Sequence, residues 1–284
     1  MHTIIEKRQL SADVYYLKVS APDIARNRKA GQFVLVQIDI DYGERIPLTI
    51  ADASAEEKWI ALVFQTVGAT TLKLAQKKEG EKIAAILGPL GQPTHIEKKG
   101  TVVCVGGGIG VAPLHPIVQA HKQAGNKVIV IMGARNKDLL IFEEEMRALA
   151  DELIIMTDDG SAGTKGLVTE PLKALCEKEP KPAEVVAIGP PIMMKFCALT
   201  TKPYNVHTVV SLNTIMIDGT GMCGGCRVTI GGETKFVCVD GPEFDGHLVD
   251  FDNMMMRMKS YKERETEDMH KCRAQAQADA LSNK

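Results

Sequence analysis

The feature that most restricts the fold of this chain is a regular alternation of strand-like and helix-like segments between residues 100 and 190. Apolar runs typical of buried strands lie at 101–105, 127–132, 153–157 and 183–188. The helical segments between them lie at 112–124, 142–150 and 171–177. A strand–helix–strand succession predicts a parallel sheet with helices on both faces. This is a nucleotide-binding architecture, although architecture alone does not define a function.

A glycine run at 106–110 follows the first of these strands and opens a helix. Glycines allow a backbone to approach a pyrophosphate closely, and the first turn of a helix offers free N–H groups to it. Gly107, Gly108 and Gly110 are therefore candidate contacts of a dinucleotide. The run departs from the strict pattern because Val111 occupies the place of the last glycine. A tight turn without a ligand is the alternative.

Three later loops follow strands of the same predicted sheet, and open α/β sheets bind ligands at the carboxyl ends of their strands. The candidate residues in these loops are Arg135, Asp158, Asp159, Gly189 and Pro190. The two carboxylates accept hydrogen bonds from ribose hydroxyls and repel a 2′-phosphate, whereas Arg135 attracts one. On balance the sequence favours NAD(H) over NADP(H).

Residues 1–98 show short strands separated by turn residues, which predicts a small β-barrel with one helix near 70–78. Its candidate ligand-binding residues lie in the segment 45–49 and in the turn before that helix. Arg45 is a suitable phosphate partner, and a helix N-terminus supplies a second phosphate contact. The candidate residues are Arg45, Pro47, Leu48, Thr49, Gly68 and Thr71. A surface arginine without a ligand is the alternative.

The third region contains a closely spaced set of potential metal ligands. Its pattern is Asp218-x4-Cys223-x2-Cys226-x11-Cys238, in a segment rich in glycine. The plant-type [2Fe–2S] loop is Cys-x4-Cys-x2-Cys with a distant fourth cysteine, so Asp218 occupies the place of the first thiolate. A zinc site formed by the three cysteines with His247 or Asp218 remains an alternative, as do unliganded cysteines.

Composition excludes several other classes of protein. The chain has 34 Lys and Arg against 36 Asp and Glu, a formal charge of −2, so no excess of cations points to nucleic acid. No apolar run approaches the ~18 residues of a membrane-spanning helix. Charged residues stand where a signal peptide would have its apolar segment. We therefore expect a cytoplasmic protein with no membrane and no nucleic acid among its partners.

In this order, the barrel, the nucleotide domain and the diiron-type loop resemble the ferredoxin–NADP reductase superfamily. More closely, the chain looks like the electron-transfer subunit of dihydroorotate dehydrogenase B and its relatives. The resemblance covers about residues 1–250 and rests on the segments 45–49, 106–113 and 158–161 and on the cysteine loop through Pro242. An Asp-plus-three-Cys loop is similar to that of the small subunit of NADH-dependent reduced ferredoxin:NADP⁺ oxidoreductase, an electron-bifurcating enzyme.

The resemblance implies an oxidoreductase subunit with FAD, NAD(H) and a [2Fe–2S] cluster. Segment 45–49 with Gly68 and Thr71 would contact FAD, and Asp218 and the three cysteines would hold the cluster. The residue pattern divides the chain into four regions, and the resemblance implies the ligands of the first three: an FAD-binding β-barrel domain at 1–98, an NAD(P)-binding α/β domain at 99–206, a cluster domain at 207–250 and a helical tail at 251–284. A larger flavin and iron–sulfur subunit would be the partner, with ferredoxin reached through the complex, and the tail would contact that subunit.

No catalytic acid, base or nucleophile is expected, because the redox chemistry belongs to the cofactors. The alternatives are a dihydroorotate dehydrogenase B electron-transfer subunit and a non-redox, zinc-containing nucleotide-binding scaffold.

Overall fold

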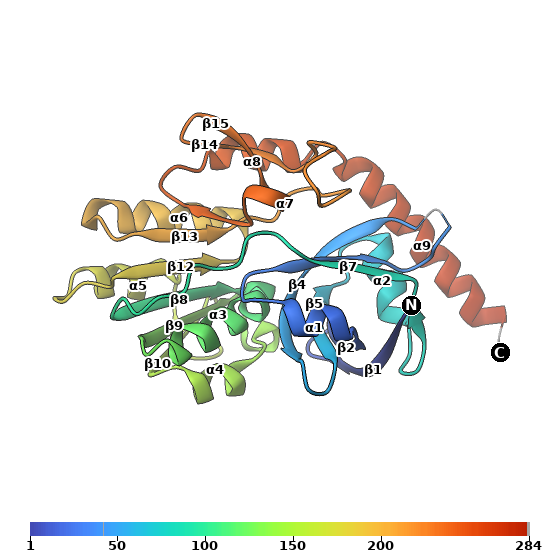
Figure 1. Ribbon diagram of the computed structural model, residues 1–284, viewed down its shortest axis with the longest axis horizontal. Coiled ribbons are helices and arrows are strands. Elements are labelled where there is room, and N and C mark those ends of the chain that lie inside the picture. Colours follow the sequence, from blue (N-terminus) through green and yellow to red (C-terminus); the bar gives the residue numbers. More distant parts are fainter. Residues whose placement is uncertain (42, 283–284) are drawn as a thin grey trace.

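The computed structural model describes residues 1–41 and 43–282, with the side chains of 273 and 275–282 left out of the description. Two seven-stranded sheets lie side by side, and a smaller C-terminal region covers the junction between them (Figure 1). The expected combination of an antiparallel barrel-like sheet with an α/β sheet is confirmed. In the described part of the chain, no helix combines the length and apolar composition that a membrane crossing requires.

The N-terminal sheet is antiparallel, with the order β6-β1-β2-β5-β4-β3-β7. Its strands are β1 (His2–Gln9), β2 (Val14–Ser20), β3 (Phe33–Gln37), β4 (Arg45–Ser54), β5 (Trp59–Gln65), β6 (Lys82–Ile83) and β7 (Ala85–Leu90). Helices α1 (Pro22–Asn27) and α2 (Ala69–Gln76) accompany it. Fully buried aliphatic residues such as Leu17, Val34 and Leu62 form its core. Helix α2 confirms the helix that the sequence predicted near 70–78.

The second sheet has the order β11-β10-β9-β8-β12-β13-β16, and only β16 runs antiparallel to its neighbour. Its strands are β8 (Thr101–Gly107), β9 (Lys127–Ala134), β10 (Glu152–Thr157), β11 (Thr164–Lys165), β12 (Glu184–Ile188), β13 (Thr208–Ser211) and β16 (Glu243–Asp245). The helices are α3 (Val111–Gln123), α4 (Glu143–Leu149), α5 (Thr169–Cys176) and α6 (Pro191–Thr201), with single 3₁₀ turns at Gly108–Gly110, Lys137–Leu139 and Lys202–Tyr204.

Alternating apolar side chains on β8 separate the two faces of this sheet. Cys104 packs in one core with α3, α4 and residues of the N-terminal sheet. Val103 and Val105 pack on the other face with α5, α6 and the cluster region. The predicted strand–helix alternation is confirmed. The central strands β8, β9 and β12 bury apolar side chains on both faces, as a sheet covered on both sides requires.

The C-terminal region consists of the hairpin β14 (Arg227–Ile230) and β15 (Glu233–Phe236), α7 (Val237–Asp240), α8 (Phe251–Met258) and α9 (Lys262–Ser282). Strands β13 and β16, from the predicted segment 207–250, extend the nucleotide sheet. Helix α8 buries Phe251 and Met254 in the main core. Helix α9 leaves the globular part and contacts α2 of the N-terminal domain, where Cys272 Sγ lies 4.0 Å from Ala69 O (Figure 1).

Candidate functional site

The glycine turn after β8 is packed tightly on one side and open on the other. A Cβ atom on Gly110 would lie 2.3 Å from the carbonyl oxygen of Ile188, and one on Gly189 would lie 3.1 Å from Gly107 Cα. Only glycine permits this close approach of the turns after β8 and β12. Gly108 has φ +53° and no atom within 4 Å of its Cβ position. The turn therefore presents a bare backbone to open space at the carboxyl edge of the sheet.

The loops after β9 and β10 are joined to each other at the same edge. Asp158 N–H donates to Ala134 O at 3.1 Å, and Asp159 N–H donates to Arg135 O at 3.2 Å. Asp159 Oδ1 accepts hydrogen bonds from the hydroxyl and the N–H of Ser161, and these bonds lower the pKa of Asp159. Arg135 thus lies beside the two predicted carboxylates. The structure places all the nucleotide-binding candidates along one sheet edge.

The candidate flavin strand is β4, which begins at the exposed Arg45. Arg45 Nε donates to Gln37 Oε1 at 3.3 Å, on the neighbouring strand β3. Thr70 Oγ1 donates to the carboxylate of Glu44, so the start of β4 and the start of α2 lie together.

The N-terminus of α2 is ordered by its own residues. Thr71 Oγ1 accepts from Gly68 N–H at 3.0 Å and donates to Gly68 O at 2.9 Å. The Cβ position of Gly68 has no neighbour within 4 Å. The six residues predicted to contact a flavin nucleotide thus come from two adjoining segments, the start of β4 and the N-terminus of α2. The N-terminus of α2 is open at Gly68.

The four predicted metal ligands form two pairs. Asp218 Oδ2 accepts from Cys223 N–H at 2.7 Å, which joins the first pair through the backbone. The second pair is Cys226 and Cys238, whose sulfur atoms are 3.2 Å apart. Cys223 is exposed, whereas Cys226 and Cys238 are 1% and 2% exposed. Across residues 1–41 and 43–282, no three His, Cys, Asp or Glu side chains are grouped so that they could hold a metal ion.

The surroundings of the sulfur atoms suit thiolates bound to iron. Gly225 N–H points to Cys223 Sγ and Cys238 N–H points to Cys226 Sγ, each at 3.4 Å. Burial, together with the neighbouring thiol of Cys226, raises the pKa of Cys238 to about 12. Two buried thiols in contact lose their protons together only when a cation compensates their charge. The donor set therefore fits an iron–sulfur group.

The alternative zinc ligand His247 lies elsewhere. Its Nε2 is 2.9 Å from Thr201 Oγ1 on α6, and its Nδ1 is 3.8 Å from a carboxylate oxygen of Asp245. His247 is engaged in this polar group and does not complete a site with the cysteines. The x4–x2 spacing of the loop already favoured a diiron cluster over this zinc site.

The cysteine loop and α3 both contact the N-terminal sheet, at different strands. A Cβ atom on Gly219, next to Asp218, would lie 2.8 Å from Leu35 Cδ1, and Leu35 is the register partner of Pro47 on β4. At the other end of β4, His115 Nδ1 donates to Ala51 O at 3.1 Å, and α3 packs on β4. The sheet that carries β4 therefore contacts the cysteine loop through Leu35 on the neighbouring strand β3, and contacts α3, the helix that follows the glycine turn, at Ala51.

Comparison with known proteins supports this division of the chain. A family profile described as the iron–sulfur cluster binding domain of dihydroorotate dehydrogenase B matches residues 213–250. A second, the oxidoreductase NAD-binding domain, matches residues 104–198. The electron transfer subunit homolog of dihydroorotate dehydrogenase B (NAD(+)) from Thermotoga maritima is 47% identical over 265 residues, 93% of each chain. The chain belongs to the family of dihydroorotate dehydrogenase B electron transfer subunits.

Other members and structures extend this relationship. The electron transfer subunit from Desulforamulus reducens is 36% identical over 83% of this chain and 92% of its own. A chain of the NADH-dependent reduced ferredoxin–NADP oxidoreductase, solved in a study of flavin-based electron bifurcation, superposes with a TM-score of 0.90. It is 45% identical and covers 95% of this chain and 97% of its own. The ferredoxin reductase of carbazole 1,9a-dioxygenase, at 19% identity and a TM-score of 0.58, shares the fold.

These matches confirm the prediction of an oxidoreductase subunit that uses FAD, NAD(H) and an iron–sulfur cluster. They favour iron–sulfur over zinc at the cysteine loop. The roles of individual residues stay predictions.

Two arginines at the cysteine loop were not predicted from the sequence. Arg227 directly follows Cys226, so its place beside a predicted ligand could have indicated a contact with the loop. Arg257 lies in the predicted tail, and its proximity to the loop arises only from tertiary packing.

Proposed function

We propose that this chain is the small subunit of an electron-bifurcating, NADH-dependent ferredoxin:NADP⁺ oxidoreductase, in which it moves electrons between NAD(H), FAD and a [2Fe–2S] cluster. The observation that carries the proposal is that the N-terminal sheet contacts both the cysteine loop, through Leu35 on β3, and α3, the helix that follows the glycine turn. This arrangement would keep the three cofactors close together, as electron transfer between them requires. FAD, when bound, accepts two electrons as hydride and releases them singly.

Gly107, Gly108 and Gly110 would bind the pyrophosphate of NADH. Asp158 and Asp159 support the choice of NADH over NADPH because exposed carboxylates repel a 2′-phosphate. Gly189 and Pro190 would form the wall of the same site next to Gly107, whose backbone they approach.

Arg45 and the N-terminus of α2 would hold the FAD pyrophosphate, since a guanidinium and free helix N–H groups both attract phosphate. Pro47, Leu48 and Thr49 would flank the flavin ring on β4. Helix α3, which follows the glycine turn, packs on the same strand, so a nicotinamide nucleotide bound at the turn would lie toward the flavin.

The two ligand pairs support a diiron centre. Asp218 with Cys223, and Cys226 with Cys238, would each supply two ligands to one iron. An oxygen ligand at Asp218 changes the potential relative to four thiolates, because ligand type and surrounding hydrogen bonds set that potential.

A larger subunit with further flavin and iron–sulfur centres would receive the electrons, with ferredoxin reached through the complex. The surface beside Cys223 supports a partner at this place. Ile217 directly precedes Asp218 and is 58% exposed, and Met222 directly precedes Cys223 and is 89% exposed. Large exposed apolar side chains next to a redox site are typical of a docking surface. Helix α9 is a second candidate contact with the partner.

The proposal is tested by anaerobic purification followed by iron, sulfide and flavin analysis and a visible spectrum. We expect about two irons per chain, as in a [2Fe–2S] centre, and bleaching that is faster with NADH than with NADPH. Cys226→Ala should lose the iron, whereas the matched variant Cys104→Ala, equally buried but in β8, should retain it. A colourless, iron-free protein would refute the redox function.

A second candidate is the electron-transfer subunit of dihydroorotate dehydrogenase B, which the name of the Thermotoga maritima relative favours. Mixing the chain with each type of large subunit separates the two. NADH-dependent turnover with ferredoxin and NADP⁺ supports the bifurcating complex, and turnover with orotate or dihydroorotate supports the alternative. Asp218→Cys tests the oxygen ligand: an unchanged spectrum and potential would exclude Asp218 from the cluster.

A further inference from the structure

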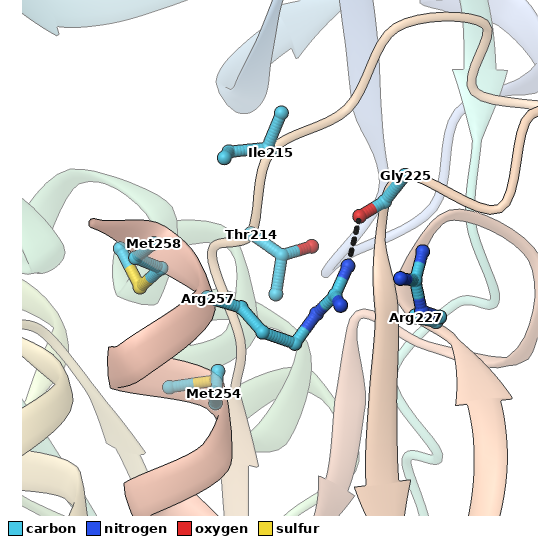
Figure 2. Close-up of a pocket in the computed structure, with 7 residues that line it drawn as sticks. All are labelled: Thr214, Ile215, Gly225, Arg227, Met254, Arg257 and Met258. Atoms are coloured by element: carbon cyan, nitrogen blue, oxygen red, sulfur yellow. Dashed lines mark hydrogen bonds between the residues drawn. The ribbon is translucent and has the colours of Figure 1, made fainter. Parts of the chain in front are cut away.

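Helix α8 reaches back to the cysteine loop through a single side chain. Arg257 Nη2 donates to Gly225 O at 3.3 Å, a contact between residues 32 positions apart (Figure 2). Arg257 is partly buried and lines a small cavity between α8 and the loop, together with Thr214, Met254 and Met258. This arginine therefore connects the C-terminal helices to the two glycines that separate Cys223 from Cys226.

A second arginine holds the preceding carbonyl. Arg227 Nη1 donates to Gly224 O at 3.1 Å. Neither arginine forms an ion pair with a carboxylate among the residues that the structure describes, so both keep an uncompensated positive charge beside the loop. Two consecutive peptide units of the ligand loop are thus held from outside by cations.

Peptide geometry links these carbonyls to the sulfur atoms. In a planar trans peptide the C=O and the following N–H point in opposite directions. With Gly224 O turned outward to Arg227, the N–H of Gly225 points inward and lies 3.4 Å from Cys223 Sγ. Because Gly225 O points to Arg257, the N–H of Cys226 points away from Arg257 by the same geometry. The arginines therefore orient the loop's hydrogen-bond donors toward the ligand side.

Helix α8 is anchored in the main core, which fixes the position of the Arg257 backbone relative to the cysteine loop. Met254, one turn earlier on the same helix, is 1% exposed and belongs to the main core, and Phe251 is 5% exposed. The Asp250 side chain caps the helix by accepting from Asn253 N–H at 3.0 Å, and Lys195 pairs with Asp252 at 2.7 Å. The core thus fixes the backbone from which the Arg257 side chain extends.

A small cavity beside Arg257 has room for a water molecule that would bond to the guanidinium. Its volume is about 20 Å³, enough for about one water molecule. The buried hydroxyl of Thr214 lines it and has no hydrogen-bond partner among residues 1–41 and 43–282 (Figure 2). A water at this point would bond to Thr214 and to the remaining N–H donors of Arg257, since a guanidinium carries five.

We propose that Arg257 is a positioning residue that raises the reduction potential of the iron–sulfur centre, a role that rests on the proposed function. Reduction adds one negative charge to the centre. A fixed positive charge and N–H groups aimed at the sulfurs both stabilise the reduced form. Loss of Arg257 removes the charge and releases the Gly225–Cys226 peptide.

The test is a redox titration of the purified full-length chain, followed by the EPR spectrum of the reduced cluster. We expect Arg257→Gln to lower the equilibrium constant for reduction about tenfold, which is about 59 mV for one electron. Arg257→Lys keeps the charge but lacks the planar fork, so its potential should lie between the two and its EPR spectrum should differ from wild type. Arg264→Gln, which removes the same charge from an exposed position on α9, should leave both unchanged.

The outcomes distinguish a failure of the role proposed for Arg257 from a failure of the redox function proposed for the chain. A wild-type chain without iron refutes the function itself. A wild-type chain with full iron, together with an Arg257→Gln variant that keeps the same iron, potential and EPR spectrum, refutes only the role of Arg257. If Arg257→Gln retains no iron, Arg257→Lys decides: a wild-type potential and spectrum in that variant would overturn the proposal.

Discussion

Replacing Gly108 by alanine separates the folding role of the glycine turn from its proposed role in binding. Gly108 has φ +53°, and its Cβ position has no neighbour within 4 Å. An L-residue in the left-handed region costs about 1–2 kcal/mol, and no steric clash adds to this. We therefore expect Gly108→Ala to fold, with the free energy of unfolding reduced by about 1 kcal/mol.

The expected effect on nucleotide affinity is larger. The methyl group projects into the open space where a pyrophosphate would approach the backbone. Losing one hydrogen bond to a charged phosphate costs about 1.5–3 kcal/mol. At about 1.4 kcal/mol for each factor of ten, the Kd for NADH should rise about 10- to 100-fold.

Isothermal titration with NADH, together with urea unfolding, measures both quantities. Gly125→Ala is the matched control, because Gly125 has φ +80° and only the Lys98 side chain near its Cβ, at 3.9 Å. It lies before β9, at the opposite edge of the sheet. It should lose similar stability and bind NADH normally. In contrast, Gly110→Ala should destabilise the fold, because its Cβ would lie 2.3 Å from Ile188 O. Equal NADH affinities for Gly108→Ala and Gly125→Ala would refute the pyrophosphate assignment.

Three further predictions follow from burial and charge. Met254→Ala should reduce the free energy of unfolding by about 2–5 kcal/mol in a urea titration, whereas Met256→Ala, 64% exposed, should change it by less than about 0.5 kcal/mol. Burial raises the pKa of Glu243 to about 7, despite the hydrogen bond from Thr94 Oγ1 at 2.6 Å. The folded chain then binds this proton more tightly than the unfolded chain, so stability falls as the pH rises from about 4.5 to 7. Glu243→Gln should be more stable than wild type by about 1–3 kcal/mol at pH 8, with a smaller difference at pH 5; an equal difference at both pH values would contradict this. Arg45→Gln should lower the flavin content of the purified chain, measured by absorbance after heat release, because it removes a phosphate partner; full flavin content would exclude Arg45 as a contact.

Much of this molecule follows from local sequence. The strand–helix alternation between residues 100 and 190 predicted the parallel sheet because apolar periodicity depends only on neighbours along the chain. The glycine turn at 106–110 and the spacing of Cys223 and Cys226 are also local patterns. Each pattern reflects a requirement of the backbone that only certain residue types meet. The glycine turn needs close approach of two backbone segments, and the cysteine segment needs a tight loop.

Contacts between distant segments were decided by the tertiary structure. Cys238 meets Cys226 because β15 folds back on β14. Gly219 lies against Leu35, and Arg257 reaches Gly225, because the cysteine region covers the junction of the two sheets and α8 buries Phe251 and Met254 beside it. Such contacts depend on the packing of whole elements against a common core, and no local pattern of residues specifies which distant side chain completes a site. The sequence thus determined the elements and the kinds of ligand, while tertiary packing determined which of them contact the N-terminal sheet and each other.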